Sequence, residues 1–107
     1  VLMAHFDVHR NPNAASRRRF PLLLDVQADI LEPLATRVVV PLAPANAARE
    51  KAVQTLMPTM RVDGVDYVAV VPQLAGMAAR DLGPAVANVA SERAAIVAAV
   101  DLLITGI

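Results

Sequence analysis

Residues 91–107 read SERAAIVAAVDLLITGI and predict a helix that the remaining chain must cover. Ser91 suits the N-cap, because its hydroxyl can accept a hydrogen bond from a free backbone N–H in the first turn. From Ala94 to Ile104 every residue except Asp101 is apolar. Gly106 can adopt the left-handed conformation that ends many helices. We therefore expect a helix of about 14 residues, roughly 21 Å long at 1.5 Å per residue.

A helix that is apolar around most of its circumference needs cover on more than one side. Steps of three and four residues group one ridge, which we expect to form the core and a dimer interface: Ile96, Ala99, Val100 and Leu103. The rest of the chain can bury part of this surface, and a second subunit can bury the remainder. A second subunit is therefore one possible source of the remaining cover, and the last residues form an exposed tip.

The composition describes a single domain spanning residues 1–107 and excludes several functions. The chain is 56% hydrophobic but only 3% aromatic, so aliphatic side chains must fill its core. Ten basic and ten acidic residues cancel, which disfavours non-specific attraction to nucleic acid or to an anionic membrane. The absence of cysteine excludes disulfides and thiolate metal sites. With no secretory segment and no apolar run long enough to span a bilayer, we expect a cytoplasmic protein.

Residues 3–9 alternate between apolar and polar types, as on a half-buried strand. His5, Asp7 and His9 share one face, and these are metal-ligand residue types. Two histidines and one carboxylate lack the further ligands of a complete site. We therefore interpret them as the polar outer face of an amphipathic strand.

A loop is predicted over residues 11–20 by Asn-Pro-Asn and by its polarity. It contains the only concentrated charge in the chain: Arg17, Arg18 and Arg19. Such a run is usually a solvated connection. The alternative is a contact for an acidic partner, because guanidinium groups pair well with carboxylates.

Two apolar strands are predicted next, over residues 21–27 and 37–42. Pro41 cannot donate to a ladder hydrogen bond, which predicts an edge, a bulge or a strand end. Asp25 and Asp29 are close enough for acid–base chemistry. However, no nucleophile or metal ligand accompanies them, so turn and capping roles are preferred.

Asp63-Gly64 between two apolar runs is a strong hairpin signal. A two-residue turn pairs Val62 with Val65, Arg61 with Asp66 and Met60 with Tyr67, matching opposite charges and apolar side chains. Before this hairpin, residues 46–56 have helical composition, and we expect only a short helical turn at their start.

Several segments resemble the CcdB family of toxins. They are LDVQADIL at 24–31, VVVPLA at 38–43, Pro58 followed by the Gly64 hairpin, Leu82-Gly83 with Val86-Ala87, and the terminal Gly106-Ile107. The resemblance covers essentially the whole chain from Met3. It implies a mainly β (α+β) fold, with an SH3-like barrel-type antiparallel sheet, a small second sheet and a C-terminal helix, assembled as a homodimer.

The resemblance also implies a function. CcdB toxins belong to type II toxin–antitoxin modules, bind the A subunit of DNA gyrase and trap the enzyme with its DNA cleaved, without catalysis, cofactor or metal. Carried over by position, the gyrase-binding residues are Ile30, Leu31, Asp101, Ile104, Thr105, Gly106 and Ile107. The family ends in Trp-Gly-Ile, whereas this chain has Thr105 at the tryptophan position. This difference predicts weaker or absent gyrase poisoning compared with a Thr105→Trp variant.

Two alternatives differ from a gyrase poison. One is a relative that binds a CcdA-like antitoxin, with Arg17, Arg18 and Arg19 as candidate contacts on charge grounds, and acts in operator regulation without poisoning gyrase. The antitoxin then supplies the DNA contacts. The other is a ribonuclease that uses His5 and His9 as acid–base groups. Zero net charge and the lack of a basic groove argue against the ribonuclease.

Overall fold

The computed structural model describes residues 5–28, 31, 34–45 and 55–106. The strands, in chain order, are β1 (Asp7–Arg10), β2 (Leu22–Asp25), β3 (Thr36–Pro44), β4 (Thr59–Val62), β5 (Val65–Ala69), β6 (Ala75–Ala78) and β7 (Ala85–Asn88). Short 3-10 turns lie at η2 (Val71–Gln73), η3 (Ala79–Asp81) and η4 (Ala90–Glu92), and the last of these leads into the helix α1 (Arg93–Thr105). The helical turn predicted to begin at Asn46 lies outside the described residues.

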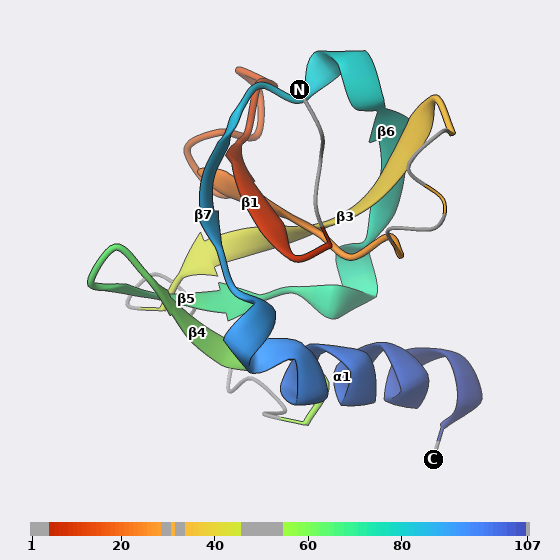
Figure 1. Ribbon diagram of the computed structural model, residues 1–107. Coiled ribbons are helices and arrows are strands. Elements are labelled where there is room, and N and C mark those ends of the chain that lie inside the picture. Colours follow the sequence, from red (N-terminus) through yellow and green to blue (C-terminus); the bar gives the residue numbers. More distant parts are fainter. Residues whose placement is uncertain (1–4, 29–30, 32–33, 46–54, 107) are drawn as a thin grey trace.

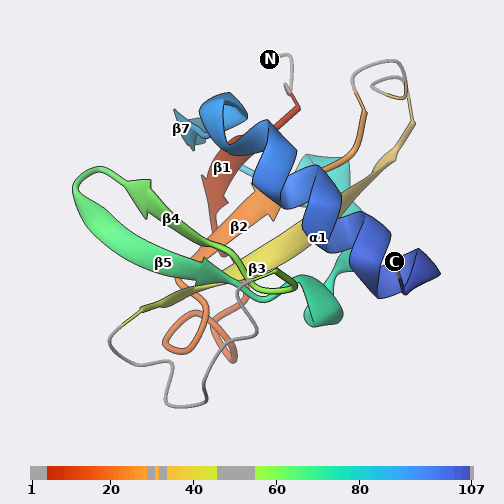
Figure 2. The same ribbon diagram turned by 90° about the horizontal axis from the view of Figure 1, so that it is seen from below.

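The described strands form one antiparallel sheet in the order β4-β5-β3-β2-β1-β7, with β6 also paired to β3. The sheet curls into a half-barrel, and α1 lies beneath it (Figure 1). Viewed from below, α1 runs across the sheet (Figure 2). The predicted fold class, mainly β with a C-terminal helix, is confirmed. The strand beyond the half-barrel is β6, which shares β3 with the main sheet and does not form a separate one. No helix in the described ranges has the length and apolar character to cross a membrane.

β3 carries two partners on the same edge, one after the other. Its first half pairs with β6 and its last three residues pair with β5. Pro41 lies between these two stretches, and its carbonyl accepts a hydrogen bond from Val70 N at 2.9 Å. The expectation of an edge, bulge or strand end at Pro41 was therefore wrong. The proline lies inside a central strand, at the point where the neighbour changes.

The β4–β5 hairpin has the predicted register: Val62 opposite Val65, Arg61 opposite Asp66 and Met60 opposite Tyr67. Asp63 and Gly64 both have positive φ, at 50° and 79°, as a two-residue type I′ turn requires. This local prediction is confirmed.

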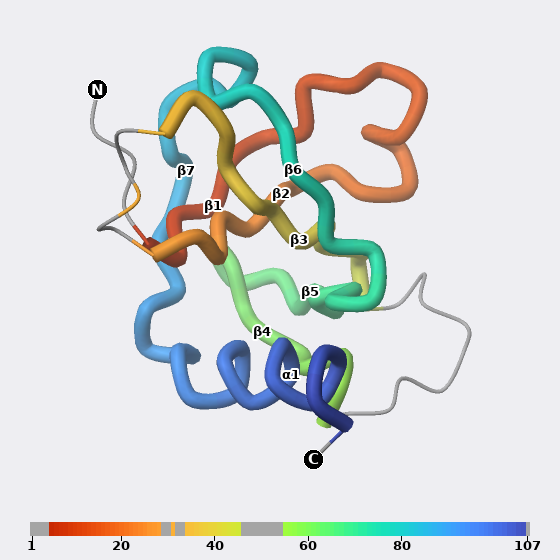
Figure 3. Tube along the Cα trace, turned by 90° about the vertical axis from the view of Figure 1, so that its right-hand side faces the viewer, coloured from red at the N-terminus to blue at the C-terminus, as the bar shows by residue number. Residues whose placement is uncertain are grey.

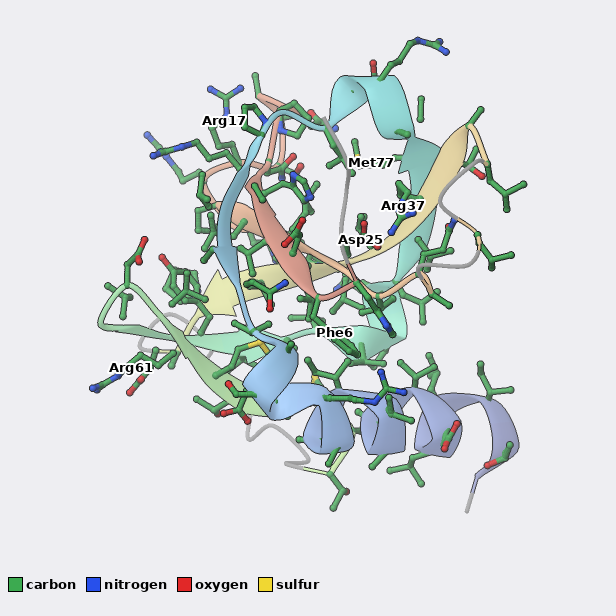
Figure 4. The ribbon with its side chains drawn as sticks, viewed as in Figure 1. Phe6, Arg17, Asp25, Arg37, Arg61 and Met77 are labelled. Atoms are coloured by element: carbon green, nitrogen blue, oxygen red, sulfur yellow. The ribbon has the colours of Figure 1, made fainter. Side chains whose placement is uncertain are left out.

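Apolar side chains gather on both sides of the sheet. The larger cluster lies between the sheet and α1 and includes Val8, Leu24, Val40 and Ile96. A smaller cluster of Leu23, Val39 and Leu82, with Met77 against it, lies on the other side. Figure 4 shows Met77 inside the curl of the sheet and Phe6 on the side of α1.

The start of α1 differs from the prediction. The chain enters through η4, and the Ser91 side chain makes no cap hydrogen bond; Asn88 Oδ1 instead accepts from Ala90 N at 2.9 Å. The predicted cap at Ser91 was wrong, because Ser91 lies inside η4 and Glu92 is the residue that precedes α1. At the other end Gly106 has φ 72° and donates to Leu102 O at 2.9 Å, which confirms the predicted left-handed cap.

The predicted solvent-facing side of the first strand was also wrong. Asp7 and His9 do share the face opposite Val8, but both are buried. The sheet curls over this face, and His9 Nδ1 donates to the carbonyl oxygen of Gly83 at 2.8 Å. The strand itself begins only at Asp7, because Phe6 has a φ of 69° and is not extended.

Candidate functional site

The C-terminal end of α1 presents an apolar tip to solvent. Ile104 is 74% exposed, Asp101, Thr105 and Gly106 are also exposed, and this end of the helix projects past the strands (Figures 1 and 2). The Thr105 hydroxyl donates to Asp101 O at 2.6 Å. Since its hydroxyl bonds the backbone of its own helix, Thr105 offers a partner chiefly a methyl group. Ile107, the last residue of the predicted set, lies outside the described residues.

The residues of α1 predicted to form the core and a dimer interface are buried in the first part of the helix and exposed in the last part. Ile96 and Ala99 are buried against the sheet, and Val100 is half-buried against the same cluster. Leu103 is 37% exposed, and Val97 is exposed to a similar degree. The single chain therefore leaves apolar surface along α1 uncovered. The predicted homodimer, which would cover it, remains a prediction.

Leu31 belongs to a second exposed apolar region, in the connection between β2 and β3. Its side chain is 44% exposed, and that of Leu34 is exposed as well. Leu31 N donates to Ala28 O at 3.0 Å, and Leu34 N donates to Leu31 O at 2.9 Å. This connection thus presents two leucines to solvent. Ile30 lies outside the described residues.

Within one chain the structure does not join these two apolar regions. The start of β3, which follows Leu34, and the end of α1 lie at separate places in Figures 1 and 3. Ile104, Thr105 and Gly106 follow one another at the end of α1, whereas Leu31 belongs to the connection that leads into β3. A two-fold symmetric dimer is one way to bring both regions to a common partner.

The predicted arginine loop lies on another part of the molecule. Residues 11–20 form a projecting loop well away from α1 (Figure 3). Arg17 is tied back to its own loop, since Nε donates to Asn11 O and Nη2 to Pro12 O, both at 3.0 Å. The Arg19 guanidinium lies over the Phe20 ring at 5.0 Å. Arg18 is exposed and has no hydrogen bond or ion pair to any described residue, so it is the arginine most available to a partner.

A shallow groove of about 280 Å³ borders this loop. Its lining combines amide and hydroxyl side chains of the loop with apolar side chains of the sheet: Asn11, Asn13, Ser16, Phe20, Leu23, Val39, Pro41, Gln73, Ala75, Gly76 and Met77. Asn11 Nδ2 is already bonded to Ser16 Oγ at 3.0 Å and to Phe20 O at 2.8 Å. Part of the polar lining is thus already hydrogen-bonded within the protein. The groove therefore suits an apolar side chain of a partner better than a small polar ligand.

His9 is poorly placed for catalysis. It is 1% exposed and fixed to the Gly83 carbonyl, and its buried Nε2 has no partner among the described residues. A general acid or base must reach its substrate directly or through one water. In the described part of the chain, no three His, Asp or Glu side chains are arranged to hold a metal ion. The burial of His9 and its bond to Gly83 thus argue against a role for this side chain as an acid–base group.

Sequence reasoning missed a buried polar network at the base of the β2–β3 connection. Asp25 Oδ2 accepts from Arg37 Nε and lies equally close to Nη2, both at 2.7 Å, and Asp25 Oδ1 accepts from Gln27 N at 2.9 Å. Figure 4 shows Asp25 and Arg37 beside each other inside the curl of the sheet. Asp25 caps a turn, as predicted. Its ion pair was not predicted, because the partner, Arg37, lies 12 residues away in the sequence. An arginine opening an otherwise apolar strand was the available signal.

A comparison with known protein families identifies the family of this chain. The model of the CcdB protein family matches residues 5–106, nearly the whole chain. The chain therefore belongs to the CcdB family and is a toxin of a toxin–antitoxin system.

Proposed function

We propose that this toxin acts by binding the A subunit of DNA gyrase and trapping the complex with cleaved DNA. The observation that carries the proposal is the exposed apolar end of α1, where Ile104 is followed by a left-handed glycine cap. Such a surface is costly to leave in water and is typical of an interaction site. The toxin then works by stabilising one conformational state of gyrase, which requires no catalytic group in the toxin itself.

Thr105 limits the strength of this interaction. A tryptophan at this position, as the family resemblance leads us to expect, can stack on an arginine and contributes on the order of 1–2 kcal/mol through the cation–π contact. Thr105 has no ring, and its hydroxyl is engaged with Asp101 O. The exposed carboxylate of Asp101 adds a negative charge beside the same tip. We therefore expect poisoning that is detectable but weak.

The test compares the natural toxin with a Thr105→Trp variant in a gyrase cleavage assay. Supercoiled plasmid, purified gyrase and toxin are incubated, and the linear DNA released after protein digestion is measured against toxin concentration. Thr105→Trp should reach half-maximal cleavage at roughly tenfold lower concentration, since 1.4 kcal/mol corresponds to a factor of ten. Thr105→Val serves as control, because it removes the hydroxyl without adding a ring. If neither the natural toxin nor the tryptophan variant traps cleaved DNA, gyrase is not the target.

We further propose a homodimer held partly by the exposed apolar side chains of α1. Val97 and Leu103 are both more than a third exposed in the single chain. Light scattering coupled to size exclusion gives the mass directly. Replacing Val97 and Leu103 with glutamate together should convert the dimer to a monomer, and a monomeric natural toxin contradicts the proposal.

A second candidate, an antitoxin-binding protein that does not poison gyrase, is favoured by the arginine loop. Arg18 is exposed beside a groove suited to an apolar side chain, so an acidic, partly apolar antitoxin segment fits both features. Arg18→Ala should weaken binding to such a peptide and flatten its dependence on salt, because an exposed charge pair is screened. Arg17→Ala is the matched control, since this guanidinium is bonded within its own loop. Equal effects of the two variants would count against a direct contact by Arg18.

A further inference from the structure

The Gln27 side chain links the backbone of two segments. Its Oε1 accepts from Val38 N in β3 at 3.1 Å, and its Nε2 donates to Leu31 O at 3.2 Å. Gln27 is itself buried. One side chain thus ties the backbone at the exposed Leu31 to a central strand of the sheet.

Gln27 is in turn held by the buried ion pair. Its backbone N–H donates to Asp25 Oδ1, and its carbonyl accepts from Arg37 Nη2 at 3.3 Å. The backbone of Gln27 thus bonds to the two residues of the ion pair, and its side chain bonds to Val38 in β3 and to Leu31. The side chain of Gln27 therefore has little freedom to release Leu31.

Stability alone is a poor explanation for this network. Burying two charges removes their hydration, and an apolar replacement of similar volume is often as stable or more so. Here Arg37 Nη1 is also buried without a partner among the described residues, which adds to the cost of the arrangement. Unlike apolar groups, charged and amide groups can form a directional hydrogen bond to one particular carbonyl, here that of Leu31.

We infer that Gln27, held by Asp25 and Arg37, is a positioning residue that fixes the backbone at Leu31 and so presents this leucine to the partner in one orientation. The inference rests on the proposed role of Leu31 in gyrase binding. A partner that meets a pre-ordered backbone does not have to order it on binding. If the backbone of Leu31 is released, binding should therefore weaken by roughly fivefold to thirtyfold. This factor corresponds to the entropy lost when the backbone of one residue is fixed.

The experiment uses two variants of the full chain, Gln27→Met and Gln27→Glu, with Val62→Ala as control. Methionine is similar in size to glutamine but lacks both hydrogen bonds. Glutamate keeps an acceptor for Val38 N and loses the donor to Leu31 O. Val62 is buried in β4, so Val62→Ala destabilises the protein without touching the network. Amide hydrogen exchange at Leu31 and Leu34 is followed by NMR, and affinity for the purified gyrase A subunit is measured in parallel.

We expect both Gln27 variants to speed exchange at Leu31 and Leu34 at least tenfold relative to the β2 and β3 amides other than Val38, whose N–H is itself bonded to Gln27, and to weaken gyrase binding. Val62→Ala should change exchange across the sheet with no preference for these two amides. Wild-type exchange at Leu31 in either folded variant overturns the inference, as does acceleration spread evenly over the sheet. Failure of both variants to fold also overturns it, since Gln27 would then be a structural residue. If the natural toxin does not bind gyrase A, the exchange result still decides the positioning role.

Discussion

Two Asp–Arg pairs join neighbouring strands of this sheet in opposite environments. Arg37 and Asp25 meet at 2.7 Å with side chains 1% and 0% exposed. Arg61 and Asp66 meet at 3.1 Å across the β4–β5 hairpin, with side chains 68% and 52% exposed. The residue types are the same, so the difference between the pairs is one of burial and of further hydrogen bonds.

The pair that is easier to predict from the sequence is the one expected to contribute less to the stability of the fold. The exposed pair follows directly from the register of a two-residue turn. The buried pair depends on how β2 and β3 meet across a longer connection. An exposed pair contributes little to the free energy of unfolding, because water and salt screen the attraction between its charges. Removing one partner of a buried pair is strongly destabilising, because the other charge is left buried and unpaired.

Asp25→Ala should give the largest effect and is the strongest test of this contrast. The change leaves the Arg37 guanidinium buried without its carboxylate and removes the acceptor for Gln27 N. The free energy of unfolding should fall by about 3–5 kcal/mol, as measured by urea denaturation.

The control for this prediction removes both charges. Asp25→Ala combined with Arg37→Met should recover part of the loss, because no buried charge is then left unpaired. A single variant that unfolds at the wild-type urea concentration would mean that the pair is open to water in solution.

The sequence predicted the local features of the fold well and the tertiary ones poorly. The Asp63-Gly64 turn and the Gly106 cap each depend on backbone conformations that few residues adopt, so nearby residues suffice to predict them. The burial of His9 and the 3-10 turn that takes up Ser91 before α1 depend on how the sheet curls and where β7 ends. The same division holds for the site: Thr105 is informative from its identity alone, whereas the link from Gln27 to Leu31 needed coordinates.

The contrast extends to two isoleucines of α1. Ile96 is 1% exposed and Ile104 is 74% exposed, although both lie in one apolar run. Ile96→Ala should lower the free energy of unfolding by about 3 kcal/mol, the usual cost of a cavity in a core. Ile104→Ala should change it by less than about 0.5 kcal/mol while weakening the proposed gyrase contact. Denaturation of both variants, together with the cleavage assay, separates the core part of the helix from its tip; similar losses of stability would mean that Ile104 is covered in solution.

Arg61→Ala should give the smallest effect. Its guanidinium lies on the surface of the hairpin and bonds only Asp66 among the described residues, so the loss should be about 0–1 kcal/mol. Raising the salt concentration should shrink even this difference, since the Debye length falls from about 10 Å at 0.1 M to about 3 Å at 1 M. Urea denaturation at both salt concentrations measures the change, with Asp66→Ala as the matched partner variant. A loss as large as that of Asp25→Ala would show that burial is not what separates the two pairs.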